Sequence, residues 1–274
     1  MLDAFFDDAR DELMGERPAA ASASVAGTAA EGDPGQQSPG AGRVTWSQLI
    51  DGDTLAAEVK RIAGRLGEPL ANSAIFKAGG YKQCRADFSL LAVLFGVIAD
   101  YDGDARWKAD AATLRDAAAR AGRNCKTATD QTFAEATLRK TELDDIVRGE
   151  RLAGAEAKAL AQWSELSDRP PLMQRMERAL QEGVSPKLAD ARTFARAADD
   201  VRHEAEMLAL LADIIQREDY EFWDDETFQG FANDLRAAAQ DLTRAAVEQN
   251  YNAAREAAGR ASQACSACHE GYRG

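Results

Sequence analysis

From about residue 51 onward, apolar side chains recur at the spacing of amphipathic helices. In the segment 54–66, for example, they stand at positions 55, 59, 62, 63 and 66. Short sequences rich in Asp, Gly and Pro interrupt this pattern and predict turns. The segments expected to be helical are about 54–66, 70–99, 107–121, further sequence up to 147, 171–182, 185–217, 225–249 and 251–272. The pattern therefore predicts an all-α protein.

The helical pattern repeats itself along the chain. A shift of 117 residues places 55–107 on the second half without a gap, so that Leu55 falls on Leu172 and Arg85 on Arg202. Matching residues in register indicate an internal duplication. Four helices joined by short turns form an antiparallel bundle, so each copy is expected to be one. We predict tandem four-helix bundles of up-down-up-down topology, with one irregular eight-helix domain as the alternative.

Composition divides the chain into four expected parts. Residues 1–45 begin with an acidic amphipathic segment and continue in small and polar residues, which predict a flexible tether. Residues 46–150 are expected to form the first bundle and 169–274 the second. Between them, 151–168 is charged and rich in alanine, and we interpret it as a helical connector.

Charge and hydropathy exclude several classes of function. The net charge of −13 argues against nucleic acid as a partner, because phosphate binding needs a basic surface. The most apolar run, at 90–98, is too short to span a membrane. No phosphate-binding loop is present, and no arrangement of residues predicts hydrolysis or group transfer. We therefore do not expect an enzyme.

The chemistry of the chain is concentrated in the sequence CSACH near its C-terminus. Cys265, Cys268 and His269 form the pattern C-x-x-C-H, by which haem c is attached. Positions three and four apart share one face of a helix, so two sulfurs and an imidazole can face the same macrocycle. We predict one covalent haem c. A disulfide or thiol motif and a metal site are the alternatives. The remaining cysteines, Cys84 and Cys125, are expected to be buried apolar residues, with a disulfide between them as the alternative.

The sequence QACSACHEGYRG at 263–274 resembles the C-terminal helix of the cytochrome c-prime family, the class II c-type cytochromes. Tyr272 and Arg273 match the end of that family's pattern, C-x-x-C-H-x-x-Y/F-R. The resemblance covers about 170–274. It implies a four-helix bundle in which Cys265 and Cys268 carry the haem and His269 is the proximal iron ligand.

The first half lacks these residues. Aligning the ends of the two copies places Lys140, Leu143 and Asp144 where the second half has its two cysteines and histidine. We therefore expect the first half to be a degenerate, haem-free copy.

The sixth iron ligand has three candidates. In the family, the first helix of the bundle faces the distal side of the haem, and here that helix carries Met173 and Met176 near its N-terminal end. An antiparallel arrangement places this end level with His269. Alternatively, both methionines are flexible core residues. His203, in the second helix of this bundle, is the third candidate, since imidazole is a good iron ligand.

These residues predict a monohaem c-type cytochrome that carries out one-electron transfer. The alternatives are a five-coordinate haem that binds gases such as NO or CO, and a non-haem helical interaction protein. The acidic charge predicts a basic redox partner protein. The family resemblance also implies a homodimer and a periplasmic location. The given N-terminus shows no secretory signal, and we expect the true start to lie upstream.

Overall fold

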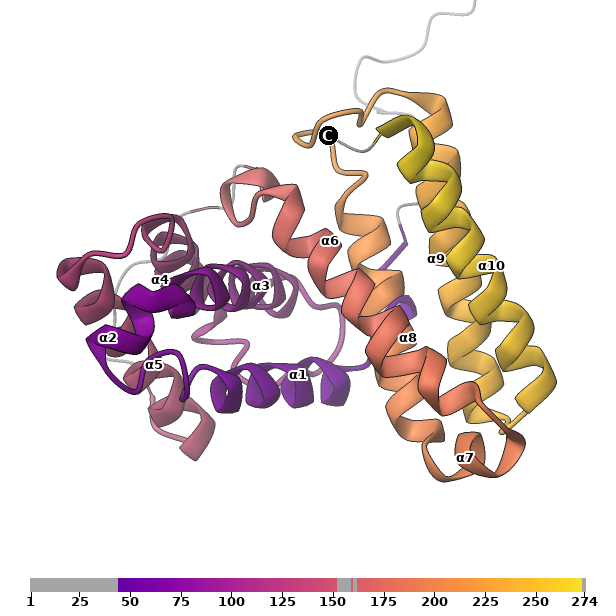
Figure 1. Cartoon of the computed structure of the whole chain (residues 1–274), viewed down its shortest axis with the longest axis horizontal. Coiled ribbons are helices and arrows are strands. Elements are labelled where there is room, and N and C mark those ends of the chain that lie inside the picture. Colours follow the sequence, from indigo (N-terminus) through magenta and orange to yellow (C-terminus); the bar gives the residue numbers. More distant parts are fainter. Residues whose placement is uncertain (1–43, 152–158, 160–161, 273–274) are drawn as a thin grey trace, which may run out of the picture. The chain divides into compact units, whose positions relative to one another are not determined.

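The computed structural model describes residues 44–151, 159 and 162–272. Within these ranges all regular secondary structure is helical (Figure 1), so the prediction of an all-α fold is confirmed. The acidic segment and tether expected over 1–45 fall almost wholly outside the described residues.

Four helices of the first half close into a bundle. Each packs against the next along the chain, and the last returns to the first. A 3-10 turn at Trp46–Gln48 precedes them. The helices are α1 (Gly52–Arg65), α3 (Tyr81–Ala99), α4 (Ala111–Asn124) and α5 (Asp130–Arg148).

The second half has the same arrangement. Its helices also pack in chain order, and α10 returns to the π-helical segment Ala179–Val184 that continues α6. A 3-10 turn at Trp163–Glu165 precedes this bundle, as Trp46–Gln48 precedes the first. The helices are α6 (Arg169–Arg178), α8 (Ala198–Ile214), α9 (Glu226–Val247) and α10 (Tyr251–Tyr272).

The single helix expected over 70–99 is broken in the structure. A short helix α2 (Ser73–Ile75) and a π-helical segment (Phe76–Gly80) precede α3. Gly79 has φ 146°, a conformation that residues with a Cβ rarely adopt. The glycine therefore permits a change of direction that helical periodicity alone does not reveal.

The helix expected over 185–217 is also broken. It consists of a 3-10 turn (Ser185–Leu188), α7 (Ala191–Arg196) and α8. The Asp190 carboxylate accepts hydrogen bonds from the backbone N–H groups of Arg192 and Thr193 and thereby begins a new helix. Of the expected connector, the described part contains the 3-10 turn Trp163–Glu165, while 152–158 and 160–161 lie outside the described residues.

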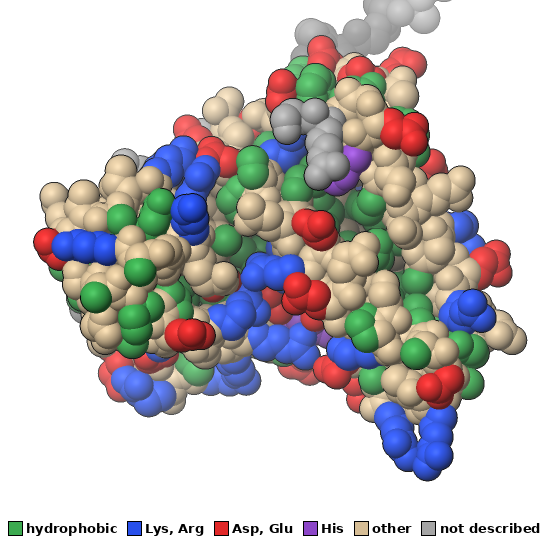
Figure 2. Space-filling view, in the orientation of Figure 1, with side chains coloured by type: hydrophobic (Ala, Val, Ile, Leu, Met, Phe, Trp, Pro, Cys, Tyr) green, Lys and Arg blue, Asp and Glu red, His purple; other side chains and the backbone are tan. Residues whose placement is uncertain are grey.

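One apolar core extends through both halves. It contains Leu55 and Phe95 of the first half together with Leu172 and Leu210 of the second. The apolar run at 90–98 lies in α3, where each of its residues is buried, so its hydrophobicity serves this core. None of the described helices combines the length and the apolarity that crossing a bilayer requires. On the face shown in Figure 2, acidic and basic side chains are interspersed.

Candidate haem-attachment site

The site lies at the C-terminal end of α10. Small buried side chains form a stripe along this helix, at Ala254, Ala257, Ala261 and Ala264. Their spacing of three and four residues matches one helical face, and alanine lets a neighbouring helix approach closely. The stripe continues into the attachment motif, so the same periodicity that seats the helix also orients the two cysteines.

Both cysteines of the motif border the apolar core. Cys265 and Cys268 are partly buried and pack against the core, whereas His269, the next residue, is exposed. All four cysteines of the chain are free thiols. Burial raises the pKa of Cys265 to about 11 and also raises the pKa of Cys268, so both remain protonated thiols at neutral pH.

Aromatic rings surround the last turn of the helix. The ring of Tyr272 lies 5.1 Å from that of Phe222, 5.5 Å from that of Phe228 and 6.4 Å from that of Phe231. The Arg169 guanidinium lies 5.0 Å from the centre of the Phe222 ring, within range of a cation–π contact. The thiols thus border an apolar, aromatic surface with one cation at its edge, which suits a large flat macrocycle with a hydrophobic face.

A cap holds this aromatic cluster in place. The Asp225 carboxylate accepts hydrogen bonds from the backbone N–H groups of Thr227 and Phe228 at the start of α9. It also accepts a hydrogen bond from Tyr272, and these bonds lower the pKa of Asp225. Partial burial and the bond to Asp225 raise the pKa of Tyr272. One carboxylate therefore joins the start of α9 to the end of the helix that bears the motif.

The two methionines of α6 differ in their surroundings. Met176 is buried within the apolar core, whereas Met173 is partly buried and packs at its border, as Cys265 and Cys268 do. Arg169, in the first turn of α6, lies over the rings of Phe222 and Phe228, and both rings pack against Tyr272 of α10. These ring contacts link the start of α6 to the last turn of the attachment helix.

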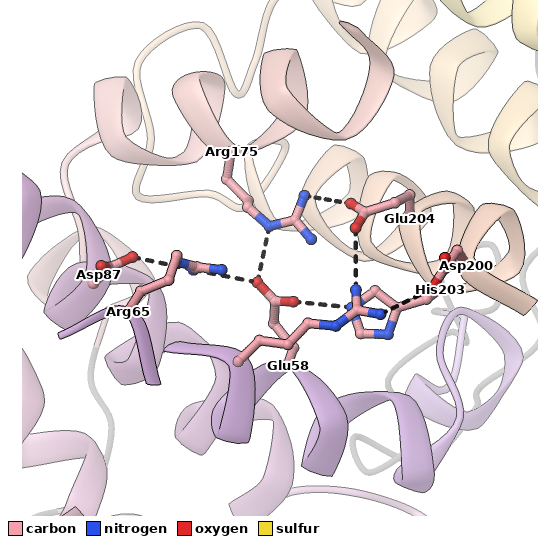
Figure 3. Close-up of polar contacts among 8 residues, drawn as sticks. Glu58, Arg65, Asp87, Arg175, Asp200, His203 and Glu204 are labelled. Atoms are coloured by element: carbon pink, nitrogen blue, oxygen red, sulfur yellow. Dashed lines mark hydrogen bonds and ion pairs between the residues drawn. The ribbon is translucent and has the colours of Figure 1, made fainter. Parts of the chain in front are cut away.

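His203 is engaged elsewhere. Its side chain is buried, and its Nε2 lies 2.9 Å from Oε2 of Glu58 in the first half (Figure 3). The structure thus brings this imidazole together with a carboxylate of α1 rather than with the cysteine pair. Nothing in the local sequence around either residue indicates this pairing, because they are 145 positions apart.

The equivalent end of the first bundle carries different chemistry. Lys140 and Asp144 form an ion pair one helical turn apart, and Leu143 between them is buried. Cys84 and Cys125 are both fully buried in this half. Burial raises the pKa of both, that of Cys125 to about 12. Among the described residues, no group of three or more His, Cys, Asp or Glu side chains is placed to hold a metal ion.

Sequence reasoning did not single out Asp225 or Arg169 for this site. The sequence Asp225-Glu226-Thr227 at the start of an expected helix is a recognisable N-cap signal. Its connection to Tyr272 depends on packing between helices and has no such signal.

Comparison with known proteins supports the same assignment. The family model described as Cytochrome C′ matches residues 164–273, a span that contains α6 to α10 and the whole attachment motif. The resemblance of the C-terminal half to this family is thereby confirmed. Neither the curated proteins nor the solved structures give a significant match.

Proposed function

We propose that this chain, whose residues 164–273 match the cytochrome c′ family, is a monohaem c-type cytochrome that transfers one electron at a time. The observation that supports this most is the end of α10, where two free thiols and an imidazole follow each other at helical spacing beside an aromatic surface. When bound, haem c supplies an iron that cycles between two oxidation states.

Several residues of the chain would hold the haem, each in a different role. Cys265 and Cys268 are the thioether positions, and His269 is the proximal ligand. The rings of Phe222, Phe228 and Tyr272 pack against one another at this edge of the core. Burial and nearby charge are the properties by which a protein adjusts a haem potential. The partly buried site and the guanidinium of Arg169 provide both.

Met173 is our candidate for the sixth ligand. Its side chain is partly buried at the border of the core, whereas that of Met176 is buried within the core. His203 is the weakest candidate, because its Nε2 already bonds to Glu58. An iron with a thioether ligand on its distal side is six-coordinate, which favours electron transfer over gas binding.

Absorption spectra of the oxidised and reduced protein test this proposal, after maturation in a periplasm with haem-attachment machinery. We expect a sharp reduced α-band of low-spin haem c. The band should broaden in Met173→Leu and stay sharp in the matched variant Met176→Leu.

Three other outcomes would contradict parts of the proposal. A broad high-spin spectrum that shifts with CO would indicate a gas-binding haem. The same response in both methionine variants would exclude Met173 as ligand. Absence of covalent haem would leave a helical interaction protein.

The remaining proposals concern the cellular location of the protein and its redox partner. Haem c is attached outside the cytoplasm, and we infer a periplasmic location, which N-terminal sequencing of the native protein tests by locating a cleaved signal. The net charge of −13 favours a basic redox partner. The affinity between this protein and its basic partner should fall as the salt concentration rises. An affinity that does not depend on salt concentration would exclude charge as the basis of docking.

A further inference from the structure

Two contacts between the halves join residues that are 117 positions apart, the same shift that superimposes the two sequence copies. The rings of Trp46 and Trp163 have centroids 5.3 Å apart. The Arg175 Nε lies 3.0 Å from Oε1 of Glu58. A residue touches its own equivalent only where a two-fold axis passes between the copies. Both contacts therefore lie on one approximate two-fold axis.

Ion pairs away from this axis occur in reciprocal form. Arg202 of the second half lies 2.8 Å from Asp51 of the first. The equivalents of these two residues are Arg85 and Asp168, which form an ion pair of 2.5 Å with the halves exchanged.

A second reciprocal set involves backbone oxygens. The Gln240 amide donates to the carbonyl oxygen of Gln48 at 3.2 Å. Its counterpart, the Arg123 guanidinium, donates to the carbonyl oxygen of Glu165 at 2.6 Å. The two hydrogen bonds are thus the same contact with the halves exchanged. A contact surface in which every contact occurs twice in this way is called isologous, and it is the type found in symmetric homodimers.

We infer that the chain is an internal pseudo-dimer: the second half carries a homodimer-type surface, and the partner bound to that surface is the chain's own first half. The first half thus has a role that needs no haem, as a permanently attached partner subunit. This inference rests on the contacts between the halves and is independent of the proposed electron transfer.

Charge at the centre of this surface determines which halves can pair. Glu58 is fully buried and lies against Arg175 and His203, and Arg65 lies 3.7 Å away (Figure 3). Arg175 also lies 2.7 Å from Glu204 of its own half. On the axis, two second halves would place Arg175 opposite Arg175, and two first halves would place Glu58 opposite Glu58. Like charges placed opposite each other in a buried contact are destabilising. The pair therefore selects one half of each kind and disfavours self-pairing.

Two single variants of the full chain reproduce those disfavoured pairings. Glu58→Arg sets arginine against arginine on the axis, and Arg175→Glu sets glutamate against glutamate. Asp53→Arg is the matched control, since it makes the same charge change on the same helix at an exposed position. Each protein carries a protease site inserted after Glu150, and its mass is measured after cleavage.

We expect the cleaved wild-type and Asp53→Arg proteins to keep the mass of the whole chain, and the two axis variants to separate into halves. Separation of the wild type on cleavage would overturn the inference. So would halves that stay together in both axis variants, because the pair would then not lie on the axis of the contact.

A second measurement covers the case in which the axis variants do not fold. A two-fold axis makes the distance from Lys60 to Asp199 equal to the distance from Glu177 to Lys82, since 60 and 177 are equivalent, as are 82 and 199. All four side chains are exposed. Spin labels introduced through a genetically encoded amino acid leave the native cysteines in place. Equal distances by pulsed electron paramagnetic resonance support the pseudo-dimer, and clearly unequal distances refute it.

Discussion

At the scale of single residues, the buried carboxylate of Glu58 has a strongly shifted pKa. Burial by itself raises its pKa, but the hydrogen bond to His203 and the charge of Arg175 outweigh burial and hold the pKa well below its ordinary value. A depressed carboxylate pKa stabilises the fold above the pKa of the unfolded chain. That contribution is lost as the pH falls through the folded-state pKa.

We therefore predict that the free energy of unfolding decreases at acidic pH, and that part of this decrease (the acid limb) depends on Glu58. The free energy of unfolding of the wild type should fall as the pH drops below about 4, near the pKa of an unfolded glutamate. In Glu58→Gln the limb should be shallower, and the free energy at pH 7 lower by about 3–5 kcal/mol, the cost of breaking a buried pair. Urea unfolding across a pH series measures both.

The exposed residue Asp53 on the same helix provides the comparison for this prediction. Asp53→Asn should leave both the acid limb and the stability at pH 7 nearly unchanged, because surface charges contribute little. An acid limb of the same slope in Glu58→Gln would show that other carboxylates govern it.

At the scale of elements, the start of α9 fixes the end of α10 through Asp225. Replacing this cap by alanine removes the acceptor of two backbone N–H groups and of the Tyr272 hydroxyl. We expect Asp225→Ala to lower the free energy of unfolding by about 1 kcal/mol, the usual cost of an N-cap. Because the last turn of α10 carries the motif, the haem spectrum of the variant should also broaden.

Asp224, the exposed neighbour of the cap, is the control for this prediction. Asp224→Ala should change neither stability nor spectrum, since the cap carboxylate belongs to Asp225. If the two alanine variants behave alike, the cap does not position the motif.

The helices themselves show where sequence periodicity suffices. The segments expected at 225–249 and 251–272 correspond closely to α9 (Glu226–Val247) and α10 (Tyr251–Tyr272). In both segments the residues that signal the helix ends and the apolar periodicity indicate the same bounds. The segments expected at 70–99 and 185–217 are broken. Each break depends on one residue, the backbone conformation of Gly79 or the capping side chain of Asp190, and neither changes the apolar period.

At the scale of the whole molecule, the two halves share one apolar core that extends from Leu55 in the first to Leu210 in the second. The described residues 44–151, 159 and 162–272 belong to a single compact unit. A shared core couples the unfolding of its parts, so we predict one cooperative thermal transition rather than two. Calorimetry checks this by comparing the calorimetric and van't Hoff enthalpies, and two resolved transitions would show that the halves unfold independently.

Features that depend on neighbours along the chain could be predicted from the amino-acid sequence. The motif at Cys265, Cys268 and His269 is read from spacing on one helix, and the all-α fold from apolar periodicity, because both are properties of local structure. The family match to residues 164–273 agrees with that reading.

Contacts between residues far apart in the chain could not be predicted in this way and are known from the packing of the helices. It paired His203 with Glu58 rather than with the attachment site, and it brought Trp46 against Trp163. A charged or aromatic residue on a helix has many partners of suitable chemistry elsewhere in the chain. Which of them it meets is set by how whole helices pack, and that packing minimises exposed apolar surface over both halves together.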